Sequence, residues 1–266
     1  MWKLLFILNF LTLFMLSAQA ARNKKIISTP LQASYQEPDH LPQARPSEKP
    51  LEKQQDLIIR RRHSFGKRGI DVSHYQGQIN WQAVAENPDV NYVYIKATEN
   101  TGLKDKMFSI NLREARRAGI PVGCYHFFSP TAAPAAQLNN LTSAVPNLKE
   151  HDLIPMIDVE VKGKKTSPEE LRRRLRVFLK SVEGYYGVKP LIYTGQNFYN
   201  NYLSGHFEDY LFMIAKYSEG IPELYGNPRF ALWQFSASGS VKGIKGAVDC
   251  SCFMDNYSLH DILIKK

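Results

Sequence analysis

The stretch GIDVSHYQGQINWQAVAENPDVNYVYIKA, residues 69–97, predicts one complete strand–helix–strand unit. Its two short apolar runs, Gly69–Val72 and Tyr92–Ala97, have the length and composition of buried strands, and Trp81–Glu86 between them predicts a helix. Two strands joined by a helix form the repeating unit of α/β proteins with parallel sheets. We therefore expect the chain from Gly69 onward to fold as an α/β domain.

The same alternation of short apolar runs and amphipathic stretches continues toward the C-terminus. Further strands are expected at Pro121–Phe128, Leu153–Val161, Lys189–Thr194, Leu211–Tyr217, Ala231–Phe235 and Ala247–Met254, and helices at Lys106–Ala118, Pro134–Ala144 and Pro168 to about Tyr186. About five β/α units are thus followed by three strands in near succession. This pattern favours an irregular, TIM-like β/α barrel over residues 69–266, with an open doubly wound sheet as the alternative.

The first twenty residues have the layout of a secretory signal peptide. Lys3 precedes the apolar run Leu4–Leu16, and Ser17–Ala20 ends in an Ala-x-Ala cleavage site. The alternative is a permanent membrane anchor, but a helix of this apolar run spans only about 20 Å, less than the roughly 30 Å of a hydrocarbon core. We therefore expect cleavage after Ala20 and an exported protein that is periplasmic, associated with the cell envelope or secreted.

Residues 21–68 form a separate, basic segment of the chain. They hold eleven Lys/Arg, five Asp/Glu and five prolines, whereas residues 69–266 carry a formal charge of only +2. We expect a flexible linker. A solvated linker is the favoured interpretation, and electrostatic contact of its charge with an anionic wall polymer or membrane surface is the alternative. Nucleic-acid binding is not expected, because no basic stripe is interleaved with aromatic residues.

The cysteines and histidines match neither a disulfide scaffold nor a known metal motif. Cys124, Cys250 and Cys252 cannot all pair within one chain, and their spacing does not fit a four-ligand zinc site, so buried free thiols are expected. His74 and His126 also lack the spacing of a zinc motif. We therefore expect neither a metal ion nor another cofactor.

Two carboxylates stand near the end of the predicted strand Leu153–Val161. Asp158 and Glu160 are two residues apart and therefore share one face of the strand. They point into a barrel if Ile157 and Val159 pack outward on its helices. Carboxylates crowded on one interior face resist joint ionisation, and the one that keeps its proton can protonate a glycosidic oxygen near neutral pH. The alternative is a buried acidic pair neutralised by Lys or Arg.

Asp71 and Asp249 repeat this situation on the first and last predicted strands. Each is a single acid at the end of an apolar run, a position that soluble proteins normally avoid. The first and last strands of a closed barrel are neighbours, so these two acids should meet. Barrel enzymes place catalytic groups at the carboxyl ends of their strands, and four acids converging on one end indicate an active site.

Six segments between Gly69 and about Tyr257 form a recognisable series. They are Asp71-Val-Ser-His-Tyr-Gln-Gly-Gln-Ile-Asn-Trp81, Tyr94-Ile-Lys-Ala-Thr-Glu99, Gly123-Cys-Tyr-His-Phe127, Asp158-Val-Glu160, Ile192-Tyr-Thr194 and Trp233-Gln234. Together and in this order, they resemble the lysozymes of glycoside hydrolase family 25. The resemblance implies an irregular barrel of five β/α units plus three strands. It also implies retaining cleavage of the β-1,4 bond between N-acetylmuramic acid and N-acetylglucosamine, so peptidoglycan glycan strands are the expected partner.

The resemblance also implies roles for the residues at matching positions. Glu160 matches the family's proton donor, and Asp158 matches the acid that assists the reacting centre. Asp71 and Asp249 match supporting carboxylates. The expected substrate-binding residues are Tyr125, Tyr193, Lys96, Glu99, Gln234 and Trp233. Tyr75 is a further aromatic for a sugar cleft, with a place in the core as the alternative.

Two stretches of the chain depart from the family's usual pattern. Asn100 stands where Gly often follows Lys-x-Thr-Glu, and Leu103 stands near the place of an aromatic. The run Cys250–Cys252 replaces the more typical apolar or Asn-containing continuation. These departures concern how the glycan is held and leave the acids complete. Lys96 and Glu99 are expected either to pair with each other or to contact the substrate.

Two other functions stay open on the sequence alone. One is a catalytically silent glycan-binding barrel, although binding by itself has no use for crowded carboxylates. The other is hydrolysis of another polysaccharide such as chitin, because barrel folds host many chemistries. The protein is expected to act as a monomer.

Overall fold

The computed structural model describes residues 68–254 and 256–265. The predicted signal peptide, residues 1–20, and the predicted linker up to residue 67 lie outside the described residues. In the described ranges, no helix is long and apolar enough to cross a membrane.

Within the described residues, nine strands form one sheet in the order β1-β9-β8-β7-β6-β5-β4-β2-β3. They are β1 (Arg68–Val72), β2 (Val93–Glu99), β3 (Leu103–Lys104), β4 (Val122–Phe127), β5 (Met156–Asp158), β6 (Leu191–Gly195), β7 (Leu211–Ala215), β8 (Arg229–Gly239) and β9 (Val248–Phe253). A parallel pairing of β1 with β2 closes eight strands into a ring, and β3 is a short antiparallel addition to β2. The ring confirms the predicted barrel and excludes the open doubly wound sheet.

Strand direction decides which ends of the strands meet. The ring is parallel from β1 through β2 and β4 to β8, whereas β9 is antiparallel to both β1 and β8. The beginning of β9 therefore lies beside the carboxyl ends of the other strands. We call this end of the barrel the mouth; it is formed by the strand ends Val72, Glu99, Phe127, Asp158, Gly195 and Ala215 and by the first residues of β9.

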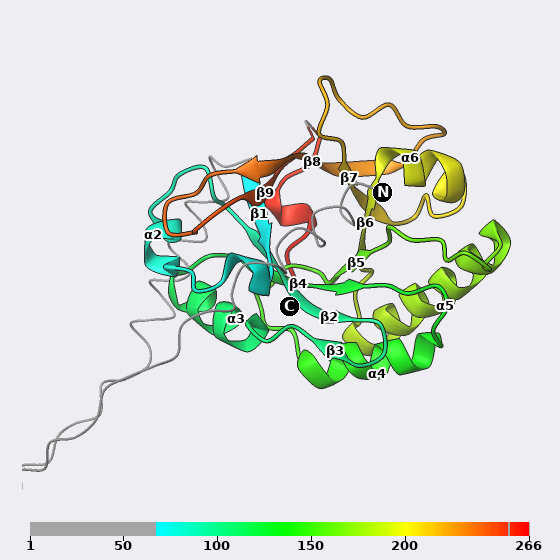
Figure 1. The fold of residues 1–266 in the computed structure, drawn as a ribbon, viewed down its shortest axis with the longest axis horizontal. Coiled ribbons are helices and arrows are strands. Elements are labelled where there is room, and N and C mark those ends of the chain that lie inside the picture. The colour runs from blue at the N-terminus through cyan, green and yellow to red at the C-terminus, as the bar shows by residue number, and fades with distance from the viewer. Residues whose placement is uncertain (1–67, 255, 266) are drawn as a thin grey trace, which may run out of the picture. The chain divides into compact units, whose positions relative to one another are not determined.

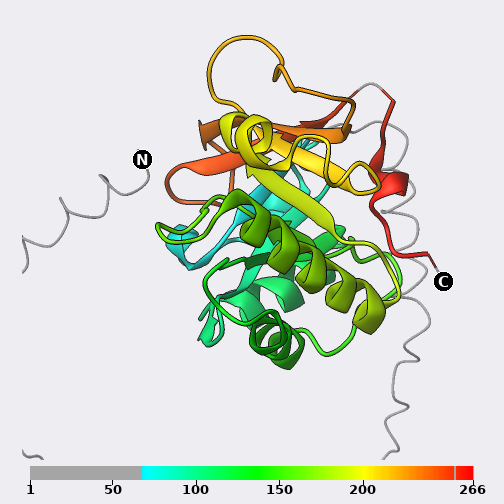
Figure 2. The ribbon, with the colours of Figure 1, turned by 90° about the vertical axis from the view of Figure 1, so that its right-hand side faces the viewer.

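Helices alternate with strands only in the first part of the domain. They are α2 (Trp81–Ala85), α3 (Phe108–Arg117), α4 (Pro134–Ala144), α5 (Pro168–Tyr186) and α6 (Gln196–Phe198), with short η1 (His74–Gln76), η2 (Tyr199–Leu203) and η3 (Leu259–Asp261). Five β/α units are thus followed by β7, β8 and β9, as predicted. Figures 1 and 2 show α3, α4 and α5 together on one side of the barrel, with β8 and β9 on the other.

The longest helix, α5, begins and ends at the predicted residues for local reasons. The Ser167 side chain accepts a hydrogen bond from the Glu170 backbone N–H (3.2 Å), and Pro168 occupies the first helical position. Gly187 ends the helix in a left-handed conformation with φ of 73°. An apolar stripe that includes Leu175 and Phe178 is buried against the sheet.

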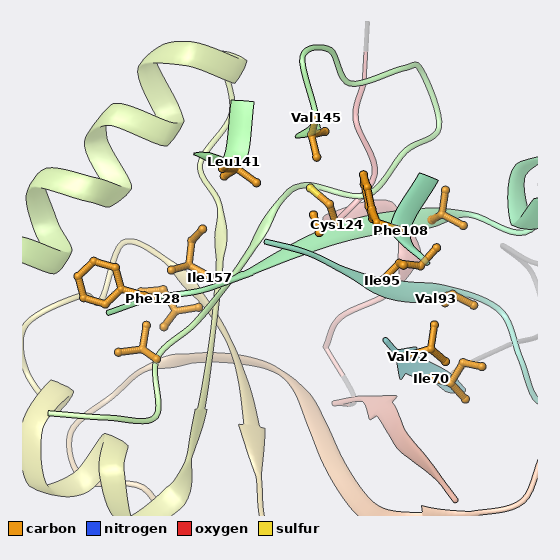
Figure 3. Packing of buried hydrophobic residues seen from close by; sticks show 14 of the residues in the cluster. Ile70, Val72, Val93, Ile95, Phe108, Cys124, Phe128, Leu141, Val145 and Ile157 are labelled. Carbon is orange, nitrogen blue, oxygen red and sulfur yellow. The ribbon is translucent and has the colours of Figure 1, made fainter. Parts of the chain in front are cut away.

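Side chains alternate between two cores across the wall of the barrel. Outward-facing residues such as Ile70 and Ile157 pack with residues of the helices (Figure 3). Inward-facing residues, such as Tyr94, Met156 and Met213, fill the barrel itself. This period of two places every second residue of a strand in the interior, which is the arrangement on which the candidate site depends.

Two glycines admit large rings into the barrel at the end opposite the mouth. A Cβ on Gly69 would lie 2.2 Å from the Tyr92 ring, and one on Gly123 would lie 2.5 Å from the Tyr94 ring. The Tyr92 hydroxyl is hydrogen-bonded to Ser251 (2.8 Å), so this ring is held in place. The interior below the mouth is therefore a packed core and not a channel.

The predicted strand Leu153–Val161 is too long. The regular strand β5 starts only at Met156, because Pro155 has no N–H to donate and the residues before it pair elsewhere. Leu153 bridges antiparallel to Leu263, and the Ile154 N–H donates to the Ile262 carbonyl (2.8 Å). The sequence contained no periodic signal for this C-terminal partner.

The prediction of free thiols is confirmed for the three cysteines, and the prediction of burial is confirmed for Cys124 alone. All three cysteines are free thiols, but only Cys124 is buried, whereas Cys250 and Cys252 are partly exposed. Burial, followed by the nearby Asp152 carboxylate, raises the pKa of Cys124 to about 12. The other two lie on the outward face of β9, where Cys250 packs against the edge of the outer core.

Candidate active site

Asp71 and Asp249 lie together at the mouth, on the first and last strands of the barrel. Asp71 is buried near the carboxyl end of β1, and Asp249 is the second residue of β9. The two are directly opposite each other in the antiparallel β1–β9 pair. Their Cβ atoms are therefore about 4.5–5.5 Å apart. Closure of the ring produces this meeting, as expected for the first and last strands of a barrel.

Asp158 and Glu160 reach the mouth from β5. The backbone after Met156 is bound on both sides: the Phe128 N–H donates to the Asp158 carbonyl (2.9 Å), and the Val159 N–H donates to the Tyr193 carbonyl (2.8 Å). Val159 is fully buried in the core between sheet and helices. The alternating side chains of Asp158 and Glu160 therefore face the interior, with Asp158 buried and Glu160 half-buried just beyond the strand.

The same acids raise the pKa values of two tyrosines, so the acids lie in one electrostatic environment. Burial raises the pKa of Tyr125, and Asp71, Asp158 and Asp249 raise it further. Burial likewise raises the pKa of Tyr193, and here the nearby Glu160 is the next largest cause. Both phenols therefore stay protonated and can donate hydrogen bonds inside the mouth.

Gln234 links one of the acids to two tyrosines. Its amide nitrogen donates to Asp71 Oδ2 (2.7 Å), and its amide oxygen accepts from the hydroxyls of Tyr193 (2.8 Å) and Tyr217 (2.6 Å). Gln234 is only 1% exposed, so its amide orientation is determined by these partners. Tyr217 was not found by sequence reasoning, because it follows β7 in an irregular segment without a motif.

Lys96 and Glu99 form an ion pair with a nitrogen–oxygen distance of 2.7 Å. The Lys96 ammonium also lies 5.4 Å from the centre of the Phe127 ring. The mutual pair, one of the two alternatives for these residues, is therefore present. Glu99 is the more exposed partner and borders the mouth at the end of β2.

Trp233 is not brought to the acids. It precedes Gln234 on β8, so the alternation that turns Gln234 inward turns Trp233 outward. Its indole N–H donates to the Lys216 carbonyl (3.0 Å), and its ring meets Phe235 edge-on. A pocket on this outer surface is lined by Trp233, Phe235, Cys252, Tyr217, Arg68 and residues 218–220.

The two histidines of the motifs lie in different surroundings. His74 Nδ1 is 2.7 Å from Asp105 Oδ2 at the mouth. His126 is fully buried between Thr98 (2.8 Å) and Gln137 (3.3 Å), and burial lowers its pKa to about 4. In the part of the chain that the structure describes, no group of three or more His, Cys, Asp or Glu residues is placed to hold a metal ion.

The described residues form a closed barrel of five β/α units and three strands, with acids from β1, β5 and β9 at one end. Residues 70–244 match the sequence model of the family described as Glycosyl hydrolases family 25. The chain belongs to this family. It is therefore a glycosidase of the lysozyme (muramidase) type, as the motifs indicated.

Other proteins show how far the likeness extends. The YegX protein of Escherichia coli (strain K12) is 39% identical over 201 residues, which cover 74% of this chain and 73% of YegX. Lysozyme M1 of Streptomyces globisporus is 32% identical over 200 residues, covering 71% of this chain and 68% of that lysozyme. A crystal structure of the bacterial lysozyme from Streptomyces coelicolor has a TM-score of 0.65 at 32% identity, covering 71% of this chain and 93% of that one. The family 25 barrel is thus shared.

Proposed function

We propose that this family 25 glycosidase cleaves the β-1,4 bond between N-acetylmuramic acid and N-acetylglucosamine of peptidoglycan, with retention of configuration. The observation that carries the proposal is the convergence of carboxylates from β1, β5 and β9 on one mouth. Two relatives, Lysozyme M1 and the bacterial lysozyme of Streptomyces coelicolor, both carry the name lysozyme, which supports the same class of substrate.

Glu160 is the general acid and then the general base of this reaction. It is the more exposed member of the β5 pair, so a glycosidic oxygen entering the mouth reaches it before Asp158. Proton transfer must come from a group within hydrogen-bond distance of the leaving oxygen. After the first step, the same carboxylate removes a proton from the attacking water, as microscopic reversibility requires.

Asp158 stabilises the intermediate. Retention proceeds either through a carboxylate nucleophile, Asp158 or Asp249, or through the substrate's own 2-acetamido group. We favour the second route, because Asp158 and Glu160 are only two residues apart and the wall sugar carries an acetamido group where it is needed. Asp158 then orients the acetamido nitrogen and offsets the developing positive charge.

The remaining polar groups of the mouth support the catalytic acids or bind the substrate. Asp71 and Asp249 act as supporting carboxylates, with Asp71 held by Gln234. The phenols of Tyr125 and Tyr193 and the pair Lys96–Glu99 are groups that can contact sugar hydroxyls. Trp233 acts on the glycan only if the substrate extends over the outer surface of β8.

The place of action follows from the same proposal. A wall hydrolase works outside the cytoplasm, so an exported, monomeric enzyme with a cleaved signal peptide fits the substrate. The basic residues 21–68 are proposed to hold the enzyme near anionic wall or membrane surfaces.

Substituting Glu160 tests the function. Glu160→Gln in the purified mature protein should lower turnover of peptidoglycan by about 10²–10⁴, because general acid catalysis is lost while size is kept. Glu150→Gln, which neutralises an exposed carboxylate outside the mouth, is the matched control and should leave turnover unchanged. Identifying the new reducing ends on peptidoglycan and on chitin separates a muramidase from a chitinase. Near-normal turnover by a correctly folded Glu160→Gln protein would refute the assignment.

A further inference from the structure

The short helix η1 carries an exposed aromatic ring at the edge of the mouth. η1 follows β1 directly, and Tyr75 is four residues beyond Asp71. Tyr75 is 74% exposed, the largest exposed fraction among the large apolar side chains that the structure describes. The expectation that this ring could be part of the core is therefore wrong. A large ring that is exposed to solvent at the edge of a catalytic mouth can stack on a ligand.

Hydrogen bonds hold η1 to both sides of the mouth. Within it, the Gln76 side chain accepts from the Ser73 N–H (2.9 Å) and completes a capping box. The Gln76 amide also donates to the Ala247 carbonyl (3.1 Å), two residues before Asp249. On the other side, the His74 N–H donates to Asp105 Oδ2 (2.9 Å). The backbone position of Tyr75 at the mouth is thus set before any ligand binds.

Asp105 also orients the ring of His74. Its carboxylate is fully buried and accepts hydrogen bonds from His74 Nδ1 (2.7 Å) and from the Met107 N–H (2.9 Å). The His74 side chain is 28% exposed, and because Nδ1 is directed at a buried acceptor, Nε2 is the ring nitrogen left for a ligand. Among the described residues, Nε2 has no hydrogen-bond partner. The ring centre lies 4.1 Å from that of Tyr75, so the two rings support each other.

We propose that His74 and Tyr75 form a saccharide subsite on the rim of the mouth. The free face of Tyr75 stacks on a sugar ring next to the cleaved bond, and His74 Nε2 exchanges a hydrogen bond with a hydroxyl of that sugar. Asp105 is a positioning residue that keeps both rings in place. The proposal rests on the proposed function, because it takes the ligand of the mouth to be a glycan. Rigid rings lose little conformational entropy on binding, which makes such a subsite effective.

Binding to the inactive enzyme tests the subsite apart from catalysis. In the full-length mature Glu160→Gln background, the dissociation constant for soluble, uncross-linked peptidoglycan strands is measured by calorimetry. Tyr75→Ala should raise it about three- to tenfold, the range of a lost ring contact. Tyr75→Phe, which keeps the ring, should stay within about twofold. His74→Ala should also raise it, because it removes both the polar contact and the support of Tyr75.

Tyr185→Ala is the matched control for loss of an exposed tyrosine. Tyr185 is 48% exposed near the C-terminal end of α5, away from the mouth. Equal affinities of the Tyr75→Ala and Tyr185→Ala proteins would overturn the subsite. In the active enzyme, Tyr75→Ala should act on KM more than on kcat. If the wild-type enzyme binds peptidoglycan strands through Tyr75 but does not cleave them, the proposed function fails while the subsite stands.

Discussion

Replacing Gln234 with leucine removes the central member of the hydrogen-bond network that holds Asp71. Leucine has nearly the same volume as glutamine but offers no donor or acceptor. The Asp71 carboxylate, 8% exposed, loses the donor at 2.7 Å. The Tyr193 hydroxyl, 3% exposed, loses its acceptor at 2.8 Å. Both groups are then left with an unmet hydrogen-bonding need in a place that water reaches poorly.

The size of the effect follows from these two losses. A hydrogen bond to a buried charged group contributes about 1.5–3 kcal/mol, and a buried hydroxyl left without a partner costs about 1–3 kcal/mol. Gln234→Leu should therefore lower the free energy of unfolding by about 2.5–6 kcal/mol, the sum of the two losses. Tyr217, 48% exposed, can turn its hydroxyl to water and adds little. Tyr217→Phe is the matched control and should cost less than about 1 kcal/mol.

Urea unfolding followed by tryptophan fluorescence measures both variants at one pH and salt concentration. The slope of the unfolding free energy against urea must stay constant for the comparison to hold. The reasoning is refuted if Gln234→Leu loses less than about 1 kcal/mol, or no more than Tyr217→Phe. Turnover at saturating peptidoglycan should fall with Gln234→Leu as well, because Asp71 is no longer held at the mouth.

Asp158→Asn should lower kcat less than Glu160→Gln, because an amide can still orient the substrate's acetamido group. A thiazoline analogue of the sugar should inhibit the enzyme as a mimic of the cyclic intermediate. A 2-fluoro sugar trapped covalently on Asp158 or Asp249, seen by mass spectrometry, would contradict the substrate-assisted route. Deleting residues 21–66 should leave turnover of soluble wall fragments unchanged, since that sequence has no periodic core pattern, and failure of the shortened protein to fold would contradict it. Burial lowers the pKa of His126 to about 4, so the unfolded chain takes up this proton first as the pH falls. Above about pH 6.5 the ring is neutral in both the folded and the unfolded chain and the folded protein keeps its full stability. Between pH 6.5 and pH 4 the unfolded chain alone gains the proton, which lowers the free energy of unfolding by about 3 kcal/mol. Urea unfolding at both pH values measures the difference in unfolding free energy between wild type and His126→Gln. This difference should decrease by that amount from the higher to the lower pH, and a difference independent of pH would refute the role given to His126.

Much of the fold could be predicted because its signals are local. Ser167, Pro168 and Gly187 mark the ends of α5 through hydrogen bonds and backbone conformations that involve only neighbouring residues. Apolar runs with a period of two mark most strands in the same way. Of the candidate site, the acids could be predicted too, because Asp71 and Asp249 interrupt apolar runs and the first and last strands of a barrel must meet.

The features that the sequence did not show depend on partners far away in the sequence. Leu153 pairs with Leu263 and not with a regular continuation of β5, and no local pattern announces that bridge. Trp233 stands in a motif beside Gln234, but a motif does not state which face of the strand each residue takes. Tyr217 and Asp105 belong to irregular segments that only packing brings to the mouth.

The sequence by itself determined the order of strands and helices, the alternation of buried side chains and the identity of the acids, because these follow from local periodicity and from the chemistry of single residues. Tertiary structure decided the direction of β9, the face on which each aromatic lies, and the hydrogen bonds that join Asp71 to Gln234 and His74 to Asp105. The physical reason is register. Hydrogen bonding between strands distant in sequence sets which residues stand opposite each other, and a shift by one residue would exchange every inward side chain for an outward one.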